Sequence, residues 1–480
     1  MSIFYVKVRN DIYSFLLLLF VSQIVACGGG ETASEINIDY DIVGPDLCKD
    51  CLEIQSPDME ISDVEAGERD LEDAEEAPQE CGPKACGGNC GECPGAGVCL
   101  SGKCECPFWE AVLGDKGKDA AFAVVEITGK AVVAAGRTQP DGKEDADMRL
   151  VKIGLFGDII WDRTYGGPQA DVIFGLASAG DGGFAAAGVL DGVENVGEFL
   201  SGSFTVIKFD KGGSLSWYKN YGGISGVARV IKPVSSGGFV VAGWIINDGE
   251  KWEKMKIARI DDSGGVIWDA VAGEECFLCY NRAYDVIETT GGGFAIAGFT
   301  TSKGAGHQDM RMITLDGAGN LKTDTAYGGA KGNEWARAVQ ETAGGGFLIA
   351  GFSSSFTNGS ADAWVVRTDD AGLQQWSQNY GGEGWDQLNA IVGKPGGFIL
   401  AGAYSSLSGG YDLWLRMIDD SGEIIWEKTI GDANWEGAEY MAPASDGNLA
   451  IVGFTMSKGS GGMDFWVIRA DETGNIPKCE

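Results

Sequence analysis

The sequence predicts an all-β protein, a seven-bladed β-propeller with four short strands in each blade. Two observations carry this prediction: a strand that ends in glycine recurs from residue 108 onward, and glycine makes up 76 of the 480 residues. The recurring strand reads FVVAG at 239–243 and FLIAG at 347–351. Its closing glycines are spaced by 51 to 55 residues: Gly136, Gly188, Gly243, Gly298, Gly351, Gly402 and Gly453. A repeat of about 50 residues is the length of one propeller blade.

Each repeat divides into four strands, shown here for the fifth copy. We expect strands at 336–341, 346–352, 363–368 and 373–380. An Asp-x-x-Gly turn at 369–372 joins the last two, and similar turns return at 261–264, 316–319, 419–422 and 471–474. The acids suggest calcium loops as one interpretation. Hairpin chemistry, in which glycine takes the positive-φ position, is the simpler one and is preferred.

A second series of residues predicts how the ring closes. A tryptophan stands in the fourth strand of most copies, with Thr323 in its place once: Trp109, Trp161, Trp217, Trp268, Trp376 and Trp426. Trp109 precedes the first glycine strand, whereas no fourth-strand tryptophan of this series follows Gly453. Residues 108–114 are therefore expected to form the outermost strand of the last blade, which removes the open sheet edges.

Composition excludes several classes of function. The net charge of −34 would repel a nucleic-acid backbone, so no nucleic-acid partner is expected. The chain has a single histidine, His307. A Ser-His-Asp or Cys-His mechanism needs a histidine as general base, so the sequence disfavours both. His307 itself is interpreted as a solvated loop residue. No metal site and no cofactor are predicted.

The first 26 residues are interpreted as an export signal. Lys7 and Arg9 precede an apolar run that is too short to span a bilayer and that stops at IVAC, residues 24–27. This string resembles a bacterial lipobox. The resemblance implies cleavage before Cys27, a lipid on its sulfur, and a place in the outer membrane or at the cell surface. An ordinary signal peptide with an incidental cysteine is the alternative.

Two segments precede the propeller, which is assigned to 107–480. Residues 27–80 are expected to form a disordered tether, because the stretch 31–80 holds 18 acids and only two bases. Residues 81–106 hold seven cysteines and much glycine, and they are interpreted as a small module held together by disulfides.

Without Cys27, twelve cysteines remain, an even number that favours disulfides in an exported chain. Cys276 and Cys279 are expected to pair with each other. Cys479 is expected to bond back to the N-terminal group at Cys104 or Cys106, across the point of ring closure. Zinc is the competing account for the Cys-x-x-Cys pairs.

Candidate site residues occur where one blade hands over to the next. The position 13 residues before the second strand is mostly polar: Asp171, Gly226, Asn281, Glu334, Trp385 with Asp386 beside it, and Glu436. Asp119 holds the corresponding place in the first copy, to within a residue. Since first strands line the central channel, these carboxylates could gather at one mouth and bind a cation or act as acid and base. Hydrogen bonding to the backbone of a neighbouring blade is the structural alternative.

Three tryptophans occupy the same loops at intervals of 50 residues: Trp335, Trp385 and Trp435. Exposed tryptophans beside carboxylates suit stacking on sugar rings. Packing between blades is the alternative, because tryptophan is usually well buried.

The repeat also resembles known propellers. The spacing Asp-x-x-Gly-x-x-x-Trp, as at 419–426 and 261–268, is similar to the repeat of quinoprotein-like propellers. The combination of G-G-F, A-G, D-x-W and Y-G-G looks like the repeated segment of bacterial surface lipoproteins. No quinone motif matches, and a propeller fold by itself implies no activity.

Three hypotheses of function follow. The first is a monomeric, lipid-anchored binding or adhesion module for a polysaccharide or an envelope protein, using Trp335, Trp385 and Trp435. The second is a glycan-active enzyme in which Glu334, Asp386 and Glu436 supply acid and base. The third is a structural scaffold.

Overall fold

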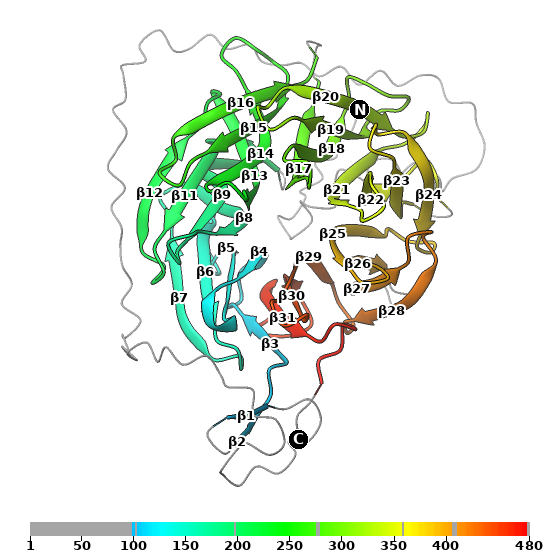
Figure 1. Ribbon diagram of the computed structural model, residues 1–480. Coiled ribbons are helices and arrows are strands. Elements are labelled where there is room, and N and C mark those ends of the chain that lie inside the picture. Colours follow the sequence, from blue (N-terminus) through cyan, green and yellow to red (C-terminus); the bar gives the residue numbers. More distant parts are fainter. Residues whose placement is uncertain are drawn as a thin grey trace, which may run out of the picture.

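The computed structural model describes residues 98–100, 103–195, 198–274, 279–357, 360–405 and 410–477. Seven antiparallel sheets stand radially in a closed ring, which confirms the seven-bladed β-propeller (Figure 1). Among the described residues, the single helical turn is a 3-10 turn, Thr128–Lys130. The part of the chain that the structure describes contains no helix long and apolar enough to cross a membrane.

The strands follow the repeat. The first blade consists of β4 (Ala120–Glu126), β5 (Val132–Thr138), β6 (Asp147–Ile153) and β7 (Ile159–Tyr165). The second contains β8 (Ala170–Ser178), β9 (Phe184–Asn195), β11 (Thr205–Phe209) and β12 (Leu215–Asn220), with the additional strand β10 (Glu198–Ser201) paired to β9. The third is β13 (Ser225–Pro233), β14 (Phe239–Ile246), β15 (Lys254–Ile260) and β16 (Val266–Ala272).

The remaining blades have the same order. The fourth is β17 (Asn281–Glu288), β18 (Phe294–Thr300), β19 (Asp309–Leu315) and β20 (Leu321–Tyr327). The fifth is β21 (Glu334–Glu341), β22 (Phe347–Ser353), β23 (Asp362–Thr368) and β24 (Gln374–Tyr380), within two residues of the predicted bounds. The sixth is β25 (Gln387–Lys394), β26 (Gly397–Ser405), β27 (Tyr411–Ile418) and β28 (Ile424–Ile430).

The last blade closes the ring with both ends of the chain. It joins β29 (Glu436–Pro443), β30 (Leu449–Thr455) and β31 (Asp464–Ala470) to β3 (Trp109–Leu113), whose register pairs Trp109 with Arg469. This confirms the predicted closing strand. A short hairpin of β1 (Val98–Leu100) and β2 (Lys103–Glu105) precedes β3.

Adjacent blades are fastened along the outer strands by the repeated turn. Tyr380, at the end of β24, donates its hydroxyl to the carbonyl of Gly422 in the next blade's Asp-x-x-Gly turn, at 2.7 Å. Trp376 lies against the same glycine. The turn is held by Asp419, whose Oδ1 accepts the N–H groups of Ser421 and Glu423. The hairpin interpretation of these turns is therefore confirmed.

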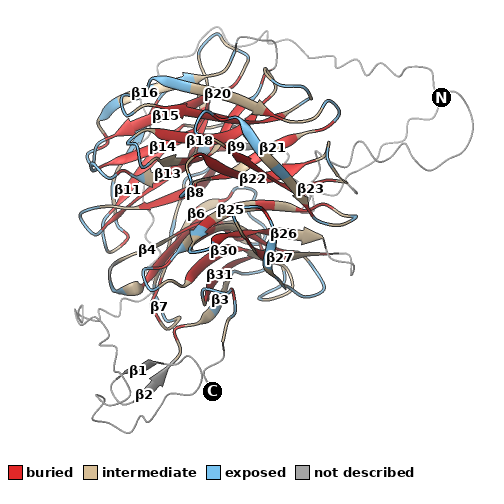
Figure 2. Ribbon diagram, turned by 45° about the vertical axis from the view of Figure 1, so that its right-hand side comes forward, coloured by how far each residue is buried: buried red, intermediate tan, exposed pale blue. Residues whose placement is uncertain are grey.

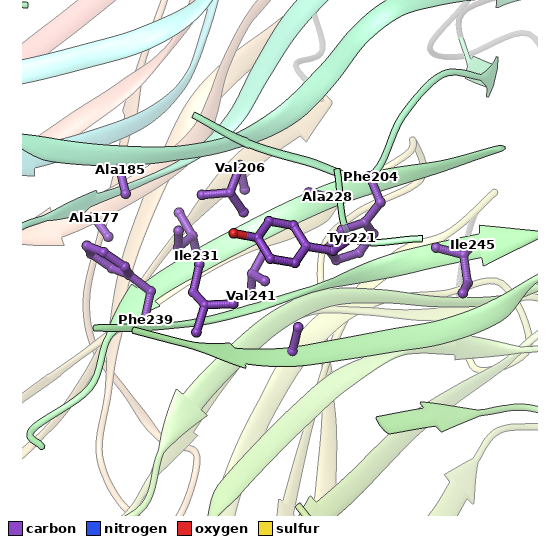
Figure 3. Packing of buried hydrophobic residues seen from close by; sticks show 13 residues of the cluster. Ala177, Ala185, Phe204, Val206, Tyr221, Ala228, Ile231, Phe239, Val241 and Ile245 are labelled. Atoms are coloured by element: carbon purple, nitrogen blue, oxygen red, sulfur yellow. The ribbon is translucent and has the colours of Figure 1, made fainter. Parts of the chain in front are cut away.

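The core lies between the inner and middle strands of neighbouring blades. Buried residues dominate these strands, whereas the outermost strands alternate between half-buried and exposed residues (Figure 2). Figure 3 shows the cluster between the second and third blades, where Tyr221 lies among small and branched side chains. Small residues such as Ala177 and Ala185 let the sheets approach closely at this contact.

Candidate ligand-binding channel

We call the residue just before or at the start of each innermost strand the handover position. Where this residue is an acid, its side chain is buried and accepts hydrogen bonds from nearby backbone N–H groups. Asp386 accepts the N–H of Gly382 through Oδ2 and that of Ser405 through Oδ1, both at 2.7 Å. Three further handover acids accept backbone N–H groups from the same two segments: Asp171, Glu334 and Glu436. Each acid thus ties a handover loop to the end of a second strand.

Burial changes the acidity of these groups. It raises the pKa of Asp171 to about 6, against the backbone N–H groups of Asp191 and Gly167 that favour the charged form. Burial also raises the pKa values of Glu334 and Asp386. Such shifts result here from removal from water rather than from crowding of the handover acids at one mouth.

Asn281 takes the handover position of the fourth blade. Its side-chain amide donates to the carbonyl of Glu253 at 3.1 Å. Its Oδ1 accepts from the guanidinium of Arg311 at 2.8 Å and from the hydroxyl of Thr300 at 2.6 Å. The amide is therefore fully engaged inside the protein.

A second acid, not singled out from the sequence, lies beside most handover acids. Asp362, at the start of β23, lies close enough to Asp386 for its charge to raise the pKa of that carboxyl, after the larger effect of burial. Gly381 separates them: a Cβ there would overlap Asp386 Oδ2 and lie 3.0 Å from Asp362 Oδ1. The pattern Asp-x-Trp or Asp-x-Arg at the start of third strands was the sequence signal: Asp147, Asp309, Asp362, Asp412 and Asp464.

The three tryptophans predicted for the handover loops, called the loop tryptophans, pack between blades. Trp335 lies within β21 rather than in a loop, whereas Trp385 and Trp435 precede β25 and β29. Their aromatic partners in the preceding blade are Phe299 for Trp335, Phe352 for Trp385 and Tyr411 for Trp435, at 4.5, 4.8 and 5.2 Å between ring centroids. Trp385 is 8% exposed, and the other two are half-buried. Packing accounts for their spacing, and a role in stacking on sugars stays a prediction.

The structure describes some of the cysteines for which disulfides were predicted. Cys106 and Cys279 are both disulfide-bonded. Cys106 Sγ lies 3.4 Å from the carbonyl oxygen of Pro477, so the chain ends come together where the ring closes. Cys276, Cys479 and the lipobox residue Cys27 lie outside the described residues, so both pairings and the lipid anchor stay predictions. His307 is exposed in its loop, as expected.

The chemistry of the channel comes from a different set of residues. Each innermost strand carries a β-bulge three residues after the handover position, a register shift that leaves one residue unpaired with the second strand. Strand β8 has a second shift, at Asp171. We call these seven residues the bulge ring: Phe122, Phe174, Arg229, Tyr284, Arg337, Asn389 and Glu439. All seven line one cavity at the centre of the propeller.

Within the bulge ring, two arginines are held by aromatic faces. The Arg229 guanidinium lies 4.7 Å from the ring centroid of Phe174 and 5.7 Å from that of Tyr284. The Arg337 guanidinium lies 4.3 Å from the Tyr284 centroid and 4.9 Å from that of Trp335. Cation–π attraction to these rings holds both guanidinium groups beside the cavity.

Neither arginine is hydrogen-bonded within the described residues, although the charges of Glu439 and Asp285 act on Arg229. No hydrogen bond or ion pair of Arg229 or Arg337 occurs there, and the buried Nε of Arg337 has no partner. Burial, and then the charge of Arg337, lower the pKa of Arg229 to about 10, which leaves it charged at neutral pH. Glu439 is the acid of the ring, and burial raises its pKa while the two arginines lower it.

The other charges of the cavity are already compensated. Lys232 Nζ lies 3.8 Å from Asp285 Oδ1 and donates to the hydroxyl of Tyr440. Asp285 also accepts the N–H groups of Val286 and Val339, at 2.9 and 3.0 Å. The excess positive charge of the cavity therefore belongs to the bulge ring.

The cavity is small, and a larger hollow lies elsewhere. Its volume is about 80 Å³, enough for several water molecules or a small polar group. A hollow of about 410 Å³ lies between the outer strands of the second and third blades. Its lysines are engaged, Lys219 by the carbonyl of Ser263 and Lys256 by Asp269.

The sequence contained a usable signal for the bulge ring. Each ring residue follows the handover position by three residues, as Arg337 follows Glu334 and Arg229 follows Gly226. Strand alternation alone does not reveal it, because a bulge changes which side chains face the channel. Within the described residues, no group of three or more His, Cys, Asp or Glu side chains is arranged to hold a metal ion.

Comparison with known proteins gives structural likenesses only. No protein-family model matches the chain. No curated protein matches its sequence. Solved structures similar to it include Sqt1 from Chaetomium thermophilum, with 12% identity, 77% of this chain and 86% of that chain covered, and a TM-score of 0.43.

Two further structures are similar to a comparable degree. The Pan2 WD40 domain of Neurospora crassa has 12% identity over 75% of this chain and 95% of that chain, with a TM-score of 0.44. An α-L-arabinofuranosidase from Fusarium graminearum has 9% identity over 77% and 99%, also with a TM-score of 0.44. At these TM-scores the likenesses carry no argument about what this chain binds.

Proposed function

We propose that this protein is a polysaccharide-binding module of the bacterial cell envelope, anchored by a lipid on Cys27, and that its ligand reaches the bulge ring. One observation carries the proposal: Arg229 and Arg337 line the central cavity without a hydrogen bond to the described part of the protein, and the buried Nε of Arg337 has no partner there. Donors fixed on aromatic faces suit a sugar unit, which offers both hydroxyl groups and apolar faces.

The same geometry favours binding over hydrolysis. Glycoside hydrolysis needs two carboxyl groups facing the scissile bond about 5 to 10 Å apart. The carboxylates first considered for this role, Glu334, Asp386 and Glu436, are buried in three different blades and bonded to their own loops. A catalytic pair built from them would have to give up these bonds.

A binding assay with a chemical readout tests the proposal. The full chain is passed over immobilised acidic and neutral envelope and plant polysaccharides, and retention and release of reducing ends are recorded in the same tubes. We expect retention by at least one polysaccharide without release. Release above the rate of a heat-denatured sample, or retention by none of the panel, would contradict the proposal.

A further inference from the structure

The bulge ring has the charge pattern of a receptor for one anionic group. It holds two arginines and one glutamate in a chain whose net charge is −34, so the sign of the charge reverses locally at the centre of the propeller. The only other charged pair that lines this cavity, Lys232 with Asp285, is neutral as a pair. An isolated positive centre inside an acidic protein selects for an anion at short range.

Geometry narrows the class of anion. Arg229 and Arg337 lie against the same ring, that of Tyr284, so both can reach a group placed at its edge. Planar guanidinium groups match the two oxygens of a carboxylate through paired N–H donors. A single carboxylate is small enough to enter this cavity of about 80 Å³.

The other residues of the bulge ring restrict the class of ligand further. Glu439 and Asn389 follow Arg337 around the ring and supply acceptors for hydroxyl groups, and Asn389 keeps its side-chain oxygen available because its amide donates to the carbonyl of Ala438. Phe122 and Phe174 complete the ring with apolar faces, 5.4 Å apart between centroids. Carboxylate, hydroxyl groups and an apolar face occur together in a uronic acid.

We infer that the bulge ring binds the carboxylate of a uronic acid unit at the end of an acidic glycan, through Arg229 and Arg337, with Glu439 and Asn389 receiving its hydroxyl groups. This inference rests on the proposed function and specifies its ligand. It places recognition at the centre of the propeller rather than at the loop tryptophans.

Isothermal titration of the full chain with trigalacturonate tests the inference, and its methyl ester is the matched ligand control. Esterification removes the negative charge and adds one methyl group to each carboxyl, so we expect saturable binding of the acid and at least about tenfold weaker binding of the ester. Equal affinities for acid and ester would overturn the inference. Binding of inorganic phosphate but not of trigalacturonate would overturn it as well.

Two variants locate the site. Arg229→Gln and Arg337→Gln should each weaken trigalacturonate binding about tenfold or more, because each removes paired donors to a charged group. Arg163→Gln is the matched control: Arg163 also lies over a tryptophan, Trp161, but on the outermost strand β7. Unchanged affinity in both channel variants, or equal loss in the control, would overturn the assignment.

A third variant distinguishes recognition of a sugar acid from recognition of a simple anion. Glu439→Gln removes the negative charge from the bulge ring, so acetate should bind more tightly, while the advantage of trigalacturonate over acetate should shrink. Circular dichroism and melting curves establish that each variant is folded. If an arginine variant fails to fold, the acid and ester comparison on the unmodified chain still decides the inference.

Failure of the inference can be told apart from failure of the proposed function. Retention of some polysaccharide that is insensitive to Arg229→Gln and Arg337→Gln would leave a binding module standing and refute its assignment to the bulge ring. Absence of retention on the whole panel would refute both.

Discussion

Single buried carboxylates hold the handover loops in place. Asp171 accepts the N–H groups of Gly167 and Asp191, which join the loop before β8 to the backbone of β9. Removing this carboxyl from water costs free energy that only a partner or a proton offsets. The residue therefore couples the folded state to pH.

The raised pKa of Asp171, about 6, predicts a pH-dependent stability. An acid with a raised pKa in the folded state favours folding when protonated, so its contribution is full below about pH 4 and is lost as pH rises through 6. We expect the free energy of unfolding of wild type relative to Asp171→Asn to fall over this window, by up to about 3 kcal/mol. Urea titrations at pH 4, 5, 6 and 7 measure it.

The exposed acid Asp141 is the control for that series, because Asp141→Asn removes one carboxylate without touching a handover loop. Its difference from wild type should stay flat across the same pH range. A flat difference for Asp171→Asn, or one that grows with pH, would contradict the prediction.

Handover glycines are required by the paired acids. A Cβ on Gly431 would overlap Asp412 Oδ1 and lie 2.9 Å from Glu436 Oε2. Gly431→Ala is expected to cost about 1 to 3 kcal/mol of stability, because the backbone or a buried carboxylate must move. Chemical denaturation measures the loss.

Gly180→Ala is the comparison, since a Cβ there meets nothing within 4 Å and Gly180 has ordinary φ. It should be neutral or stabilising by about 0.4 to 1 kcal/mol, through a less flexible unfolded chain. Similar losses at both positions would show that the acid pair is not what requires glycine.

At the scale of elements, the blades are joined by the Asp-x-x-Gly turn of one blade and the outermost strand of the blade before it. Tyr165, Tyr327 and Tyr380 repeat one contact, a hydroxyl that donates to the carbonyl of the turn glycine in the following blade. The periodic tyrosine and tryptophan of the sequence are thus parts of one joint between sheets.

Tyr380→Phe tests this joint. It leaves the carbonyl of Gly422 without its donor in a buried place, so we expect a loss of about 1 to 2 kcal/mol in the free energy of unfolding. Tyr218→Phe, at a tyrosine 41% exposed on β12, should change stability by less than about 0.5 kcal/mol. Equal effects in urea denaturation would contradict the role given to the tyrosine joint.

For the whole molecule, the period and phase of the repeats were enough to predict seven blades and their closure by β3. The four strands of the fifth blade were predictable because their turns carry glycine at positive φ, as at Gly345 and Gly372. The bulge ring was not predicted, because a shift of register depends on how two strands pair rather than on the alternation of either one. The acid pairs were missed because they form across blades.

Ring closure also predicts which of the two expected disulfides contributes more to stability. Cys106→Ser with Cys479→Ser should cost up to about 5 kcal/mol, since their predicted bond would close nearly the whole propeller. Cys276→Ser with Cys279→Ser should cost about 2 kcal/mol, because only a four-residue loop is closed. Melting under non-reducing conditions compares them, and a larger loss for the second pair would contradict the predicted pairings.

Hydrogen–deuterium exchange of the full chain, with and without a retained acidic polysaccharide, locates ligand contact without any substitution. Binding at the bulge ring should slow exchange in peptides from β13 and β21, which contain Arg229 and Arg337, and leave the handover loops before β25 and β29 unchanged. Protection confined to the handover loops at Trp385 and Trp435, or to the outer strands, would show that the ligand does not enter the channel.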